Sequence, residues 1–94
     1  MYVFSVNATT PQPFDDFKAG DVVPFMVYLN FKDLSGAELL CKFYVEQAGF
    51  EKVAIDKRKM IAEQFLSDPK LIAADPTMKD AMETGYAIQV FSAH

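Results

Sequence analysis

The chain has 94 residues, room for one folded domain, because much longer chains are needed before a second hydrophobic core forms. Its residues are 51% hydrophobic and 23% charged, a balance far from that of disordered proteins. A formal net charge of −4 repels phosphate backbones and anionic headgroups, so we expect neither nucleic acid nor a membrane as a partner. One cysteine forms no intrachain disulfide, which favours a reducing, cytoplasmic location.

The first eight residues are rich in aromatic and β-branched side chains and predict a strand with Tyr2 and Phe4 on one face. This apolar run is too short for a signal peptide or a membrane span. Residues 9–13 contain two prolines, which lack the amide donors of a sheet, so a loop follows. We expect Phe14 and Phe17 to pack this loop against the body of the domain.

Residues 22–31 give the strongest strand signal in the chain. Phe25 and Val27 share one face of this strand, whereas Met26 and Tyr28 share the other. Pro24 near its start predicts an edge or a bulge there, because a missing amide does little harm at such a position.

Ser35 and Glu38 have the spacing of a capping box and predict a helix that begins there and ends at Gly49. Residues 53–56 then alternate as a short strand, which a helical crossover sets parallel to the previous strand in a right-handed βαβ unit. For residues 57–66 the spacing of Ile61 and Phe65 favours a second helix, with an extension of the strand to Ile61 as the alternative.

Two Asp-Pro pairs, at residues 68–69 and 75–76, each combine a capping acid with a proline suited to the first helical position. They predict two short helical segments, the second of which ends at Gly85. Residues 86–91 read as a last strand.

These elements predict a single α+β domain over residues 1–94, with about four strands in the order ββαβα(α)β. We expect one mixed sheet with helices packed on one face, an arrangement that loosely resembles the ferredoxin-like fold with its second hairpin rearranged. The helices are too few to cover all the apolar strand residues, so the uncovered ones should form a dimer interface or a ligand groove; our candidates are Tyr2, Phe4, Met26, Tyr28, Tyr86 and Ile88.

The residues that usually carry catalysis are scarce, and we name no catalytic residue, no metal ligand and no cofactor. The only histidine, His94, is the last residue of the chain, where side chains are rarely held in place. Cys41 lies within the predicted helix among apolar neighbours and should pack as a small hydrophobic residue. Acidic residues of the first loop fit no calcium-binding spacing, and Asp56, Asp68 and Asp75 are explained as helix caps.

One basic cluster, Lys57, Arg58 and Lys59, is a candidate site for a phosphate or a carboxylate. If these residues form the first turn of a helix, the amides of that turn attract anions as well. The alternative, which we favour, is a solvated helix face, because the glycine-rich loop of phosphate sites is missing.

Two functional hypotheses follow. The first is a non-enzymatic interaction or regulatory protein that acts as a homodimer through an apolar sheet face. The second is a small ligand carrier or cofactor-free enzyme of the dimeric α+β barrel kind, with a tyrosine-lined pocket for an apolar molecule. A third possibility, a partner for a basic protein, rests only on the acidic charge and the small size.

Overall fold

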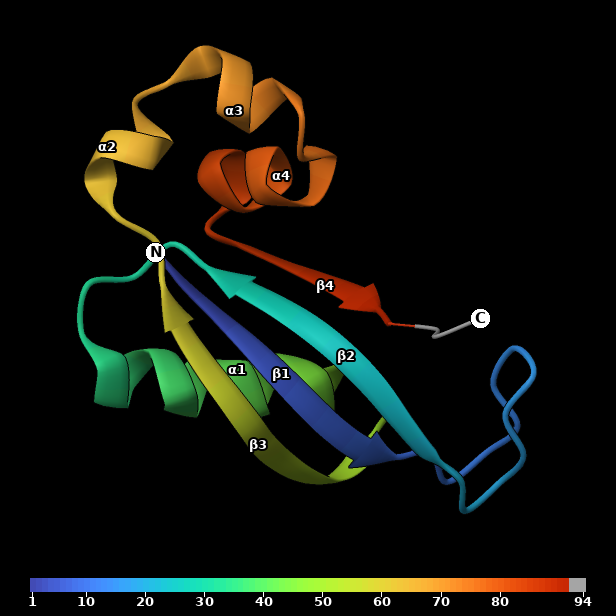
Figure 1. The fold of residues 1–94 in the computed structure, drawn as a ribbon. Coiled ribbons are helices and arrows are strands. Elements are labelled where there is room, and N and C mark those ends of the chain that lie inside the picture. The colour runs from blue at the N-terminus through green and yellow to red at the C-terminus, as the bar shows by residue number, and fades with distance from the viewer. Residues whose placement is uncertain (92–94) are drawn as a thin grey trace.

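Four strands form one sheet in the computed structural model, which describes residues 1–91 (Figure 1). They are β1 (Tyr2–Thr9), β2 (Val22–Leu29), β3 (Glu51–Met60) and β4 (Tyr86–Val90). The helices are α1 (Leu34–Gln47), α2 (Glu63–Leu66), α3 (Pro69–Ala73) and α4 (Pro76–Thr84). This arrangement confirms the α+β class and the predicted order of the elements.

The spatial order of the strands is β3-β1-β2-β4, and every neighbouring pair is antiparallel. β2 and β3 do run in the same direction, as the predicted βαβ unit requires, but β1 lies between them. The reason is the β1–β2 hairpin, whose two strands pair directly. The edge of β1 that faces away from β2 is free, and the crossover through α1 brings β3 to that edge. The sheet is therefore antiparallel throughout rather than mixed.

The main core lies between α1 and one face of the sheet. Phe4 of β1 is opposite Val27 of β2, and both are fully buried under α1. α1 contributes Ala37, Cys41 and Val45, which recur every four residues and so form a single stripe along the helix.

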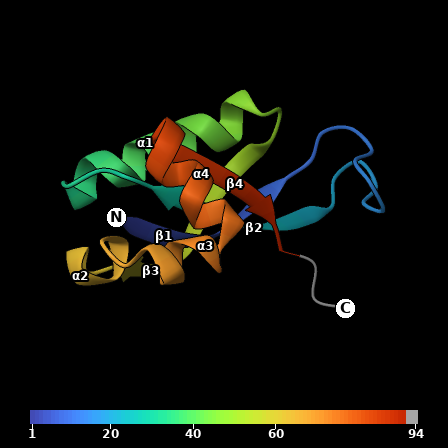
Figure 2. The same cartoon turned by 90° about the horizontal axis from the view of Figure 1, so that it is seen from above.

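A second, smaller core lies on the opposite face of the sheet. Met78 and Ala81 of α4 are buried there together with Met1, and Tyr28 and Ala87 pack against them. Figure 2 shows α1 on one side of the strands and α2 and α3 on the other. The helices are thus divided between the two faces rather than gathered on one. The tight turn at Gly85 (φ 99°) folds α4 back beside β4, where its buried residues pack against Tyr28 and Ala87 on the face opposite to α1.

The predicted helix boundaries are correct at the C-terminal end of α1 and wrong by two residues at its start. The N-cap is Asp33, whose carboxylate accepts a hydrogen bond of 2.8 Å from the amide of Gly36. Ser35 therefore lies inside the first turn. Gly49 ends the helix with φ 104°, as the sequence predicted, and the amide of Phe50 donates back to Val45 O at 3.4 Å.

Residues 57–60 form the last part of β3, so the favoured helix over residues 57–66 is wrong and the alternative is correct. Ser5, Phe4 and Val3 of β1 pair with Lys57, Arg58 and Lys59. Asp56 lies beside a register shift in this ladder and caps no helix. Pairing with β1 supplies backbone hydrogen bonds that outweigh the helical spacing, and only α2 remains of the expected helix.

The loop between β1 and β2 packs onto the domain as expected. The ring of Phe14 meets that of Phe50 edge to face at a centroid separation of 5.2 Å, and Phe17 also packs against the core. Within residues 1–91, no helix combines the length and the apolar character needed to cross a membrane.

Candidate functional site

The six apolar residues proposed from the sequence do not share one sheet face. Tyr86 pairs with Leu29 and Ile88 with Val27, which places both on the face covered by α1, together with Tyr2 and Phe4. The other two candidates, Met26 and Tyr28, lie on the opposite face. The alternation within each strand predicts this grouping, but the register between strands places these residues on two different faces. The expected continuous apolar face is therefore wrong in this form, and its members belong to two different surfaces.

The first surface runs from α1 to the edge strand β4. Leu39 and Phe43 lie four residues apart on the outer side of α1 and are 71% and 53% exposed. Phe43 contacts Tyr44 edge to face at 5.5 Å, and Tyr44 in turn stacks on Tyr86 of β4 at a centroid separation of 3.7 Å. We call these four side chains the α1–β4 ridge. It joins an exposed helix flank to the edge of the sheet.

The free edge of β4 adds unpaired backbone groups to this surface. Residues that exchange hydrogen bonds alternate along an antiparallel pair. At the two ends of the β2–β4 ladder, Asn30 N donates to Gly85 O and Phe91 N donates to Pro24 O, both at 2.9 Å. Every second residue of β4 between these two points therefore forms hydrogen bonds with β2, and these residues are Ala87 and Gln89. The N–H and C=O groups of Tyr86, Ile88 and Val90 therefore point away from the sheet, and β4 pairs with no other strand within residues 1–91.

The second surface is a cleft of about 440 Å³ on the opposite face, between the sheet and α2. We call it the Tyr28 cleft. Most of its lining is apolar, with polar groups from Tyr28, Lys59 and Asp75; the lining residues are Val3, Met26, Tyr28, Lys59, Met60, Ile61, Ala62, Phe65, Asp75 and Met78. Its volume is within the range of about 300–1,000 Å³ that small-molecule sites occupy.

Tyr28 and Asp75 form the polar contact of this cleft. The Tyr28 hydroxyl donates to one carboxylate oxygen of Asp75 at 3.4 Å, and the amide of Met78 donates to the other at 3.1 Å. Burial raises the pKa of Tyr28, and the negative charge of Asp75 raises it further. Tyr28 is therefore a neutral hydrogen-bond donor at neutral pH and is poorly suited to act as a base. Asp75 caps α4 as predicted, but its place in the cleft was not foreseen.

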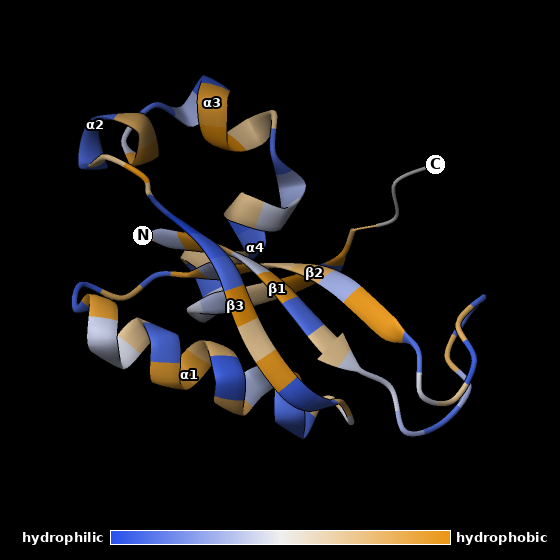
Figure 3. Ribbon diagram, turned by 60° about the horizontal axis from the view of Figure 1, so that its bottom comes forward, coloured by the Kyte–Doolittle hydropathy of each residue, from blue (hydrophilic) through white to orange (hydrophobic). Residues whose placement is uncertain are grey.

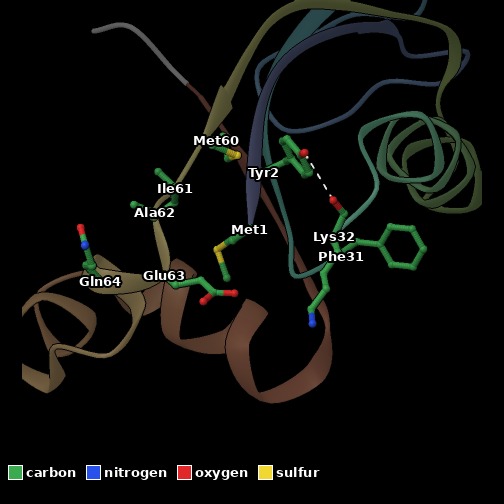
Figure 4. A pocket seen from close by; sticks show the side chains of 9 residues that line it. All are labelled: Met1, Tyr2, Phe31, Lys32, Met60, Ile61, Ala62, Glu63 and Gln64. Atoms are coloured by element: carbon green, nitrogen blue, oxygen red, sulfur yellow. Dashed lines mark hydrogen bonds between the residues drawn. The ribbon is translucent and has the colours of Figure 1, made fainter.

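A second hollow, of about 580 Å³, lies on the other side of the same β3–α2 connection. Figure 4 shows that the start of β1, the β2–α1 turn and the β3–α2 connection form its walls, and that the side chain of Phe31 points away from Tyr2. Its one internal hydrogen bond runs from the Tyr2 hydroxyl to Lys32 O, at 3.4 Å. Met60, Ile61 and Ala62 separate it from the Tyr28 cleft.

The basic cluster is divided by the alternation of β3. Arg58 faces the α1 side and forms an ion pair with Glu38 of α1. Lys57 and Lys59 pair with Ser5 and Val3 and so point to the opposite face, where Lys59 lines the Tyr28 cleft. In Figure 3 hydrophilic colour covers the half of β3 that leads into α2. The three residues do not form one anion site, and their setting is a strand rather than a helix.

The structure gives no support to nucleophilic chemistry at Cys41. Its side chain is fully buried in the main core, as expected, and burial raises the pKa of its thiol to about 12. The loop acids Asp15, Asp16 and Asp21 belong to no group that could hold a metal ion, and residues 1–91 contain no such group. His94 lies outside the described residues.

Sequence reasoning missed the ridge residues Leu39 and Phe43, although a signal for them exists. They are apolar and four residues apart, yet the core stripe of α1 is already supplied by Ala37, Cys41 and Val45. An apolar pair outside the core stripe of a helix indicates a surface that contacts something else.

No protein-family model, curated protein or solved structure matches this chain. A functional assignment therefore depends on the geometry of these two surfaces.

Proposed function

We propose that the protein is a non-enzymatic interaction module that acts as a homodimer, joined through its β4 edge and the α1–β4 ridge. The observation that carries this proposal is an uncharged edge strand with outward backbone groups, next to an exposed aromatic ridge. The proposal keeps the homodimer expected from the sequence and moves its contact from a sheet face to a sheet edge.

The two edges of the sheet differ in charge, and this difference favours β4. β3 is the longer edge strand but carries Lys57, Arg58 and Lys59, and lysines on an edge are a common protection against strand pairing. β4 has the sequence Tyr-Ala-Ile-Gln-Val, without a charged or proline residue. A strand that approaches this edge therefore meets no charge and no missing amide.

A second copy of the chain is the partner that fits this edge best. Two β4 strands that meet antiparallel about a two-fold axis at Ile88 exchange their outward N–H and C=O groups, and the assembly closes after two copies. The same axis brings the two α1–β4 ridges to one side of the joint sheet. Tyr86 and Tyr44, and Phe43 beside them, then lie next to the partner copy, and loss of their contact with water supplies association energy.

The first test is sedimentation equilibrium of the wild-type chain over a range of micromolar concentrations. We expect a species of twice 10.6 kDa that dissociates on dilution. Phe43→Glu should shift the equilibrium to the monomer, because it places a carboxylate in the interface. Leu71→Glu is the matched control: Leu71 is an exposed apolar residue of α3, away from the ridge, and its replacement should leave the dimer intact.

A second pair of variants tests the backbone contact. Val90→Pro removes an outward N–H without touching a β2–β4 hydrogen bond, whereas Val90→Ala shortens the side chain and keeps the amide. We expect dissociation of the proline variant alone, with circular dichroism showing that both remain folded. A wild-type protein that stays at 10.6 kDa at all concentrations would refute the proposal. So would a dimer that Phe43→Glu and Val90→Pro leave unchanged.

A further inference from the structure

We infer that the Tyr28 cleft binds a small amphipathic anion, namely a carboxylate with an apolar body, whose head group contacts Lys59. This inference goes beyond the homodimer and concerns the opposite face of the sheet. It deepens the second functional hypothesis, a carrier of a small apolar ligand, by adding a charge to that ligand.

The cleft wall suits an apolar body. Three methionines, Met26, Met60 and Met78, line it together with Phe65. Methionine side chains are flexible and polarisable, so they adapt to ligands of different shape. Met60 is 68% exposed and Phe65 is 36% exposed, which leaves apolar area for a ligand to cover.

The charges of the cleft select the head group. Two charged residues line it, Lys59 and Asp75. Asp75 already accepts from Met78 N and from the Tyr28 hydroxyl, and it lies at the N-terminus of α4, where the helix dipole offsets its charge. Lys59 has no carboxylate within 4 Å among residues 1–91, in contrast to Arg58 on the other face. Lys59 is exposed, so its ammonium group is the charge of the cleft that can meet an anionic head group.

Position along the strand adds a second cation. Lys57 lies two residues before Lys59 and on the same face of β3, outside the lining of the cleft. An anionic head group at Lys59 gains from this neighbour, and Asp75 repels it from the other end of the cleft. The ligand is thereby oriented with its charge at β3 and its apolar body towards Met26 and Met78.

Three ten-carbon probes distinguish the head-group charge: decanoate, decanol and decyltrimethylammonium, each used below the concentration at which it forms micelles. Binding is followed at pH 7 by amide chemical shifts of the isotope-labelled protein. We expect saturable shifts with decanoate at residues that line the Tyr28 cleft. Decanol should bind more weakly, and decyltrimethylammonium most weakly of the three.

Two variants test the contacts. Lys59→Gln should weaken decanoate binding about tenfold, the usual effect of losing one charge-assisted contact, and should leave decanol binding unchanged. Lys42→Gln, on the exposed side of α1, is the matched control and should have no effect. Ala62→Trp should abolish binding of both probes, because Ala62 is an exposed residue of the cleft wall and a large ring there fills the space.

Several outcomes would overturn the inference. One is the absence of saturable shifts with decanoate. Another is decyltrimethylammonium binding as tightly as decanoate, which would assign the site to cations through Asp75. A third is a set of decanoate shifts confined to the α1–β4 ridge, or unchanged by both Lys59→Gln and Ala62→Trp.

Discussion

The reactivity of Cys41 gives a direct measure of how well the main core excludes water. Burial, the largest contribution, raises the pKa of this thiol from 9.0 to about 12, and Lys42 and Glu38 add smaller effects of opposite sign. Because the thiolate is the reactive form, a shift of about three units lowers its population about a thousandfold at any pH below 9. We therefore predict that the native thiol reacts at least about a thousandfold more slowly than the unfolded one.

The assay is labelling with an aromatic disulfide reagent at pH 8, in buffer and in denaturing urea. The exposed control is Val22→Cys in a Cys41→Ala background, since Val22 is 58% exposed on β2 and its replacement should react at close to the unfolded rate. If native Cys41 reacts within tenfold of the urea-unfolded chain, the thiol is accessible and our description of the core is wrong.

The same shift predicts a loss of stability at high pH. A pKa that is raised in the folded state stabilises the protein fully below the unfolded pKa, and this contribution disappears as pH rises through the folded value. For Cys41 the window lies between pH 9 and about 12, and the loss approaches about 4 kcal/mol. Tyr28 acts in the same direction, so urea unfolding should compare Cys41→Ala with the parent in a Tyr28→Phe background. Equal pH slopes in the two proteins would contradict the assignment.

Two further predictions concern the α4 region. Asp75→Ala should lower the free energy of unfolding by about 1–2 kcal/mol, because it removes the α4 N-cap and the acceptor of the Tyr28 hydroxyl. Asp75→Asn keeps the cap and should cost less, so equal losses in urea unfolding would argue against capping. Gly85→Ala should cost about 1 kcal/mol from its φ of 99° alone, since an added Cβ meets no atom within 4 Å. An unchanged thermal midpoint would show that this backbone conformation relaxes.

Signals that depend on neighbouring residues predicted the structure well. Asp75 before Pro76 marks the start of α4, and Gly49 and Gly85 mark helix ends. The cap, the proline ring and the positive φ act within a few positions of the chain, so the sequence alone contains their causes. The strand over residues 22–29 follows in the same way from its own alternation.

Features that depend on strand pairing could not be predicted. Lys57 to Met60 have the spacing of a helix with Ile61 and Phe65, and only the ladder with β1 makes them a strand. The face of Ile88 is fixed by its partner Val27, which lies 61 positions earlier in the chain. A shift of one residue in that pairing would move Tyr86 and Ile88 to the other side of the sheet. The grouping of apolar candidates therefore failed where register decides the face.

The register also makes the two proposals independent of each other. The ridge residues Phe43 and Tyr86 lie on the α1 side of the sheet, whereas Lys59 and Tyr28 lie on the opposite face, Tyr28 on β2 next to β4 and Lys59 on β3 at the other edge. A dimer joined at β4 therefore leaves the Tyr28 cleft open in both copies. Phe43→Glu should dissociate the dimer and leave decanoate binding unchanged. Lys59→Gln should weaken decanoate binding and leave the dimer intact. If either variant altered both dimerisation and decanoate binding, the two faces of the sheet would not act as the independent surfaces that the register implies.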